Sequence, residues 1–462
     1  MSKAPTHSVK SARPESTSTF DMCAMVPILA CAYAEIVSPL LMYPKDIPSP
    51  GASPADALQI VMTPRLENKI FWPALATITV VLVLRNRSRL ALPPHIKFLF
   101  AYLAFAGASV LWAFNPQLSF SRFVLQIMIL TSIVLTGLLA KGDMMRGLFL
   151  CFAFACVLNI PFVLNQEPIF YENLIIGYPG YFTFKGYLGE CAAIAFLLSL
   201  RELLHSGWRR ALGIIVIVVA IWLVNESKSK GSFGLAMLAP ILAWLTLIIG
   251  KKMRISPAIV ILPIAILYQL LTIIPGLDFL NRISWHVFGN YTLSGRTVIW
   301  DFVNYEIGRS PLIGWGYQSF WLVGPNGPSV VDGPGWVKTM PSAHNGYLDT
   351  MLDTGYVGFA LFVIFIFATL HAIGRVANRE PGRAWLLLTL ALFILLTNML
   401  ETAWMRGMEP LWLLFLIVAA ETGRYWRPFQ RGVSEPMGRG PVVAGWRPGL
   451  ARAWGPDNPA RF

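Results

Sequence analysis

The sequence predicts an all-α polytopic membrane protein, and three observations lead to this prediction. Of the 462 residues, 55% are hydrophobic and only 13% are charged, whereas a soluble domain has about 25% charged residues. The mean hydropathy is +0.58. The apolar residues form stretches close to the ~20 residues that a helix needs to cross a bilayer. Most of this chain is therefore expected to lie in lipid.

About twelve apolar stretches follow one another, and each is expected to form a transmembrane helix. They cover residues 22–43, 68–84, 96–114, 120–140, 145–164, 183–200, 209–224, 231–250, 256–275, 347–373, 384–400 and 410–421. The first stretch also allows a second interpretation, a cleaved signal peptide, because Ala30, Ala32 and Ala34 offer small residues spaced for cleavage. An uncleaved helix is favoured because apolar residues continue through Met42.

The positions of the basic residues predict how these helices are oriented. Compact basic clusters, such as Arg85 to Arg89 and Lys251 to Arg254, fall in alternate loops. Short loops rich in Lys and Arg stay on the cytoplasmic side, which places both termini in the cytoplasm. The net charge of +13 is explained by these loops and by the C-terminal tail, so nucleic acid is not an expected partner. The five cysteines lie in or beside apolar stretches and show no disulfide or metal-ligand spacing.

The chain is thus expected to have five parts. Residues 1–21 are a disordered cytoplasmic N-terminus, and residues 22–275 form transmembrane helices one to nine. Residues 276–346 are a long outward loop, residues 347–423 form helices ten to twelve, and residues 424–462 are a basic cytoplasmic tail near anionic headgroups. Loops longer than about 12–15 residues are uncommon unless they are functional or disordered, so the outward loop is a candidate functional region.

The outward loop is predicted to contain two short amphipathic helices, at residues 281–290 and 296–307. In the second, Ser294 is a candidate N-cap and Tyr305 is expected on the apolar side with Ile299 and Phe302. Arg296 would then lie in the first turn, where its side chain and the free N–H groups of the helix suit an anion.

Several polar residues at the outward ends of the helices are further candidates. Lys228 and Lys230 stand in an outward loop against the charge rule, and His344 comes just before the tenth helix. Asn345 and Asp349 share a face of that helix, where they would support His344 or bind an acceptor. Other candidates are Trp315, as a sugar-stacking or interface residue, and the ionisable residues in or near the spans, Glu35, Glu190 and Glu401. Glu401, near the outward end of the eleventh span, could approach Arg296 or Arg406 as a support residue.

Three motifs together carry a family resemblance. They are SGRTVIW at residues 294–300, RSPLIGWG at 309–316 and HNGYLD at 344–349. In this order and spacing they resemble the O-antigen ligase and O-antigen polymerase superfamily, nearest to exopolysaccharide polymerases of the succinoglycan type. The resemblance implies a GT-C-like fold in the bacterial inner membrane. It also implies a glycosyltransferase with a periplasmic active site that uses an undecaprenyl-diphosphate-linked oligosaccharide as donor.

The resemblance also implies roles for individual residues. His344 would act as the general base or orient the acceptor hydroxyl, and Arg296 with Lys230 or Lys228 would bind the diphosphate. Many relatives carry Arg at the lysine position, and Lys keeps the charge but not the bidentate geometry. No metal or cofactor is implied. The implied partners are the lipid-linked donor, a glycan acceptor, the bilayer and other polysaccharide-assembly proteins.

Two alternatives remain at this stage. An O-antigen ligase would use the same chemistry but transfer the glycan to lipid A-core, and the sequence separates it poorly from a polymerase. A polysaccharide transporter or flippase also has about twelve spans, but it would concentrate ionisable groups at the bilayer midplane. Here the unusual cations cluster in outward loops, which favours an enzyme.

Overall fold

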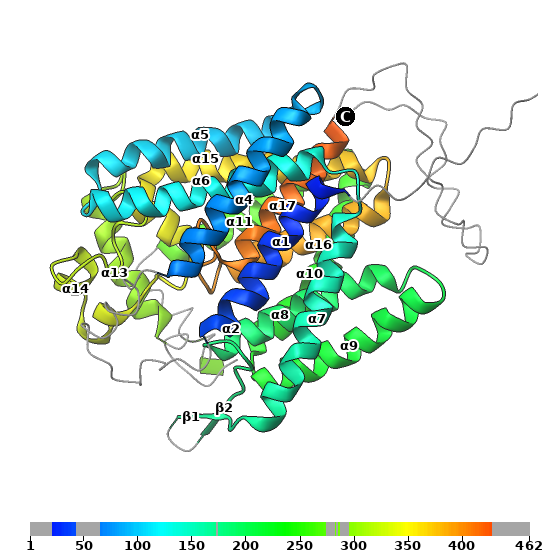
Figure 1. Cartoon of the computed structure of the whole chain (residues 1–462). Helices are drawn as coiled ribbons and strands as arrows, with labels where there is room; N and C mark the ends of the chain where they lie inside the picture. The colour runs from blue at the N-terminus through cyan, green and yellow to red at the C-terminus, as the bar shows by residue number, and fades with distance from the viewer. Residues whose placement is uncertain are drawn as a thin grey trace, which may run out of the picture.

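The computed structural model describes residues 21–42, 65–171, 174–273, 282, 285–286 and 295–426 of the chain. The expected N-terminal segment and most of the basic tail lie outside these residues, as does nearly all of the helix expected at 281–290. The described part is a bundle of helices with one short antiparallel hairpin (Figure 1).

The helices and strands have the following bounds: α1 Met22–Ala32, η1 Tyr33–Val37, α2 Ser38–Met42, α4 Leu66–Arg85, η2 Arg87–Arg89, α5 Pro94–Ala108, η3 Ser109–Trp112, α6 Pro116–Leu139, α7 Met144–Asn165, β1 Ile169–Tyr171, β2 Leu174–Gly177, α8 Lys185–Glu202, α9 Trp208–Ser227, α10 Lys230–Met253, α11 Pro257–Ile273, α13 Arg296–Arg309, α14 Pro328–Val331, η4 Gly335–Thr339, α15 Gly346–Ala377, α16 Pro381–Thr397, α17 Pro410–Gly423 and η5 Arg424–Trp426.

A helix lies at each of the twelve apolar stretches. Within the described residues, eight helical segments are long and apolar enough to cross a membrane. The other four are α8, α11, α16 and α17, which are shorter or less apolar. The all-α polytopic class is confirmed, and the number of helices that cross the membrane stays a prediction.

The shortest of these four helices, α17, lies in the interior of the bundle. Every residue from Leu411 to Gly423 is buried, and the helix packs against α6 and α16. A helix that is covered by protein does not have to span the full hydrocarbon thickness of the bilayer, because neighbouring helices satisfy the polar groups at its ends. This position accounts for a core helix of 14 residues in a membrane bundle.

Loops with basic residues meet at one end of the bundle. Arg424 donates a hydrogen bond to the carbonyl of Gly142 at 3.1 Å, and the amide of Gly142 donates to Asp21 Oδ2 at 2.6 Å. Arg201 forms an ion pair with Asp143 at 2.8 Å. Figure 1 shows the start of α1 and the end of α17 together there, with α13 and α14 at the opposite end.

The RSPLIGWG segment docks into a break in α15. Gly355 has φ +63° and ψ −171°, which interrupts the helix. The freed backbone groups pair with the segment, because the amide of Trp315 donates to Leu352 O at 2.9 Å and that of Tyr356 donates to Pro311 O at 2.7 Å. A Cβ on Gly355 would lie 2.3 Å from the carbonyl carbon of Leu312. The glycine is therefore required by the close approach of two backbones.

The helix predicted at residues 296–307 is present as α13, with two corrections. Its N-cap is Gly295, at φ 89°, and not Ser294. Tyr305 is 67% exposed, whereas Ile299, Phe302 and Val303 are buried as expected. The register of the helix explains the second correction, because positions 299, 302 and 303 share one face and position 305 is turned away from it.

Candidate functional site

The side chain of Glu401 joins Arg296 and His344. Glu401 Oε1 accepts a hydrogen bond from Arg296 Nη2 at 2.5 Å, and Glu401 Oε2 lies 2.8 Å from His344 Nδ1. Glu401 follows α16, Arg296 begins α13 and His344 lies two residues before α15. Three segments that are far apart in the chain thus bring two predicted site residues to one carboxylate.

Arg296 is held at the start of α13 by two acceptors on the segment after α16. Its Nε donates to the carbonyl of Leu400 at 2.8 Å, next to the ion pair with Glu401. The left-handed conformation of Gly295 turns the chain sharply into the helix. The guanidinium therefore lies beside the first turn of a helix, where the positive end of the helix dipole favours an anion.

His344 is fixed by the backbone on both sides of it. It has φ 48°, a left-handed conformation that is uncommon for a residue with a Cβ. The carbonyl of the preceding Ala343 accepts from Trp300 Nε1 at 3.0 Å. Asn345 caps α15, because its side chain accepts from the amides of Tyr347 and Leu348. Such constrained conformations cluster at functional sites.

Asp349 positions the segments around His344. The buried carboxylate accepts hydrogen bonds from Trp321 Nε1 at 2.7 Å and from Thr402 Oγ1 at 2.7 Å, as well as from the amide of Ala343. Its Oδ2 also lies 3.2 Å from Arg406 Nη2. The predicted role of Asp349 as a support residue is therefore consistent with its contacts.

The charges around Glu401 keep it ionised. Burial opposes the charged form, but the hydrogen bond from His344 and the charges of His344 and Arg296 outweigh it and lower the pKa of Glu401. A carboxylate that is charged at neutral pH can accept the Nδ1–H of His344. In that tautomer Nε2 carries a lone pair and can take up a proton.

Lys228 and Lys230 lie in a different place, the turn between α9 and α10. Lys228 caps the end of α9 at φ 52°, and its Cβ contributes to the tight packing of this turn against Gly177 of β2. Lys230 begins α10 and is near enough to Lys185 for their charges to interact. The grouping of Lys230 with Arg296 and His344 stays a prediction.

Trp315 belongs to the packing of the outward segment. Its Nε1 donates to the carbonyl of Glu306 at 3.0 Å, and the guanidinium of Arg309 lies 5.2 Å from its ring centre. Its ring also packs against Phe320. These contacts give Trp315 a structural role in the segment that docks into α15, and a role in sugar stacking stays a prediction.

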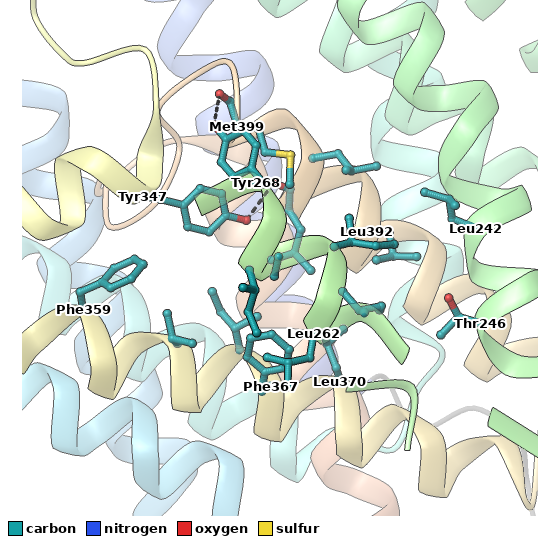
Figure 2. A pocket seen from close by; sticks show the side chains of 18 residues that line it. Leu242, Thr246, Leu262, Tyr268, Tyr347, Phe359, Phe367, Leu370, Leu392 and Met399 are labelled. Carbon is teal, nitrogen blue, oxygen red and sulfur yellow. Dashed lines mark hydrogen bonds between the residues drawn. The ribbon is translucent and has the colours of Figure 1, made fainter. Parts of the chain in front are cut away.

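An apolar cavity of about 250 Å³ opens next to the Glu401 segment. It is lined by side chains of α10, α11, α15 and α16. Figure 2 shows Tyr268, Tyr347 and Met399 together at one end and Phe367 and Leu370 at the other. Tyr268 accepts a hydrogen bond from Asn345 Nδ2 at 2.9 Å and donates to Met399 O at 2.6 Å. The tyrosine thus connects the cavity with the residue next to His344.

Some of the residues that this geometry brings together were weak candidates or were not predicted from the sequence. Glu401 was expected near the outward end of its span, where it could approach Arg296 or Arg406. The structure shows its contact with Arg296 and adds a contact with His344 that was not expected. Tyr268 and Thr402 were not singled out, because an aromatic residue and a threonine at the end of a span carry no distinctive signal. Within the described ranges, no three His, Cys, Asp or Glu side chains are grouped so as to hold a metal ion.

Comparison with known proteins identifies the part of the chain that contains Arg296 and His344. Residues 215–363 match the family model described as O-antigen ligase. No curated protein matches the chain. The matched range includes Lys228, Lys230, Arg296 and His344 and ends before Glu401. This match supports a membrane enzyme of ligase or polymerase type, and the likeness to succinoglycan-type polymerases stays a prediction. The match covers less than half of the chain, and over residues 215–363 the protein is similar to the O-antigen ligase family.

Proposed function

We propose that this protein transfers a glycan from undecaprenyl diphosphate to a sugar acceptor on the periplasmic side of the bacterial inner membrane. The main support is the Glu401 carboxylate, which contacts both a cation and a histidine. Glu401 thereby holds Arg296, which is suited to stabilise a leaving diphosphate, close to His344, which is suited to proton transfer. We propose a metal-independent GT-C type enzyme with both termini in the cytoplasm.

The proposed reaction forms one bond and breaks one. The hydroxyl oxygen of the acceptor bonds to the anomeric carbon of the donor, and the bond from that carbon to the diphosphate oxygen breaks. His344 Nε2 takes the hydroxyl proton while Glu401 holds Nδ1–H. Undecaprenyl diphosphate leaves with additional negative charge, which Arg296 stabilises. Lys230 or Lys228 is the second cation in this proposal.

The apolar cavity next to Asn345 supports the proposal that the donor is lipid-linked. Its lining is almost entirely aliphatic and aromatic, and its polar end is Tyr268, which contacts Asn345. An isoprenoid chain is an apolar ligand of the kind that gains free energy from burial in such a place. A lipid tail in this cavity would place its diphosphate near the residues that follow α16.

Among acceptors, we favour a second lipid-linked repeat unit, which makes the enzyme a polymerase of exopolysaccharide or O-antigen. The sequence motifs around Gly316 and His344 support this choice. The ligase alternative differs only in the acceptor, lipid A-core. Other polysaccharide-assembly proteins are proposed as partners.

The decisive experiment incubates purified protein in lipid nanodiscs with undecaprenyl-diphosphate oligosaccharide. Longer lipid-linked chains indicate a polymerase, and transfer to added lipid A-core indicates a ligase. His344→Ala and Arg296→Ala are expected to abolish either product. His371→Ala and Arg309→Ala are the controls. His371 is on α15, which begins just after His344, and Arg309 ends α13, which Arg296 begins. Both side chains are exposed, and they contact Ser256 and Asp332, respectively, and not Glu401. Full activity of His344→Ala would refute the proposed base.

A further inference from the structure

A second cavity, of about 290 Å³, lies where η1, α8 and the segment before α17 meet. Three carboxylic residues line it, Glu35 from η1, Glu190 from α8 and Glu409 from the segment before α17. Arg65 and Arg406 line it as well. The proposed reaction uses none of these five residues. Ionisable groups inside a membrane bundle are costly and mark substrate sites by default.

Glu35 gives the strongest indication of a ligand. Its side chain is 2% exposed, and its Oε1 has no hydrogen-bond partner among the described residues. A buried polar atom without a hydrogen-bond partner destabilises the folded protein. Glu35 also lies in a π-helical turn, Tyr33–Val37, a distortion that is frequent at functional sites. The structure therefore maintains an unpaired acceptor in the wall of a cavity.

The cavity borders the residues of the proposed active site. Arg406, which lines it, forms the ion pair with Asp349 described above. Glu190 lies close enough to Glu401 and Glu409 for their charges to interact. The segment between α16 and α17 thus contributes Met399 to the apolar cavity, Glu401 to the site and Glu409 to this polar cavity.

We propose that the polar cavity binds the acceptor saccharide, an inference that rests on the proposed function. Carboxylates accept hydrogen bonds from the hydroxyl groups of a sugar, and Arg65 and Arg406 donate to its oxygens. Tyr187 and Phe182 add aromatic surface to the wall. The three carboxyl groups disfavour the binding of a diphosphate in this cavity, and the polar lining disfavours the binding of an isoprenoid chain. A polyhydroxylated neutral ligand satisfies both kinds of polar group.

The test measures saccharide binding without chemistry. The probe is one repeat unit, released by mild acid from the lipid-linked glycan of cells that lack this protein and labelled with a fluorophore at its reducing end. Fluorescence anisotropy is followed as full-length protein in nanodiscs is added. Glu35→Gln, Glu190→Gln and Glu409→Gln are expected to weaken binding about tenfold each, a loss within the range of one ordinary hydrogen bond.

Two further variants separate binding from folding. Glu167→Gln changes an exposed carboxylate outside the cavity and is expected to bind like the parent protein. Thr183→Trp leaves the carboxylates intact but fills part of the cavity, and it is expected to abolish binding. Each variant is checked by its unfolding temperature, so that a misfolded sample is not counted as a loss of binding.

The outcomes distinguish this inference from the proposed function. If the parent protein does not bind the probe, or if Thr183→Trp and all three glutamine variants bind it normally, the saccharide site is refuted while glycan transfer can still be observed. If binding follows the expected pattern but no transfer occurs with the lipid-linked donor, the saccharide site stands and the transferase proposal fails.

Discussion

Glu401→Gln tests whether the carboxylate between Arg296 and His344 organises the site. Glutamine has the same size, but it is neutral and presents one acceptor and one donor group. Its amide nitrogen must therefore face either Arg296 Nη2 or His344 Nδ1, where the carboxylate now accepts from both. The variant loses the charge and reverses one hydrogen bond without creating a cavity.

The expected effect follows from these two contacts. A hydrogen bond to a charged group contributes about 1.5–3 kcal/mol. The side chain of Glu401 is 41% exposed, and solvent screening reduces the total for the two bonds to roughly 2–3 kcal/mol. If this free energy is lost from the transition state, the turnover number falls roughly 30- to 150-fold, because each 1.4 kcal/mol is a factor of ten.

The assay measures initial rates with undecaprenyl-diphosphate oligosaccharide in nanodiscs, at several donor concentrations. A loss in kcat with little change in KM is expected, because the orientation of His344 matters for proton transfer more than for binding. Asp301→Asn is the control, since this carboxylate is exposed on α13. A kcat of Glu401→Gln within twofold of the parent enzyme would refute the reasoning.

Three further predictions concern stability. Burial and the nearby charge of Glu401 raise the pKa of Glu409 to about 8, so the folded state holds this proton more tightly than the unfolded state does. The stability of the protein should therefore fall as pH rises from the ordinary carboxyl range to about 8. Above that pH, thermal unfolding should show that Glu409→Gln is more stable than the parent protein. Gly355→Ala should destabilise by at least about 2–3 kcal/mol, because its Cβ would meet the Leu312 backbone, whereas Gly382→Ala, which meets nothing, should unfold at or above the parent temperature. Asp349→Asn should lower the unfolding temperature and the transfer rate together, and an unchanged rate would contradict its positioning role.

Local sequence patterns predicted the helices well because each depends on a run of apolar residues. A helix is present at every such run, with ends shifted by a few residues. The break in α15 was not predicted, because it depends on the approach of a segment about 40 residues earlier in the chain. A single glycine such as Gly355 within an apolar stretch does not predict a break, because membrane helices tolerate glycine. Only its partner, the Pro311 backbone, explains why the helix opens there.

The candidate site was predictable where residues stand in a motif and unpredictable where they meet only in space. Arg296 and His344 come from the SGR and HNG motifs, and the structure brings them to the same carboxylate. Glu401 is 57 residues from His344, lies outside the matched range and carries no motif of its own. Its role depends on the turn after α16, whose geometry no periodicity reveals. Lys230 is the reverse case, because the family resemblance assigns it to the site, whereas it lies in the turn between α9 and α10, near Lys185.

The segment between α16 and α17 explains how one short loop can serve all three parts of the proposed reaction. Irregular backbone is tolerated at membrane depth only where protein or a cavity covers it. Asn398 meets this requirement, because its side chain accepts from the amides of Ala403 and Trp404 and its carbonyl accepts from the amide of Gly346. A segment stabilised in this way contributes Met399 to the apolar cavity and Glu409 to the polar one, with Glu401 between these two positions in the chain. The lipid and the acceptor would then be bound by different residues of one segment, which separates the apolar tail from the groups that bind sugar.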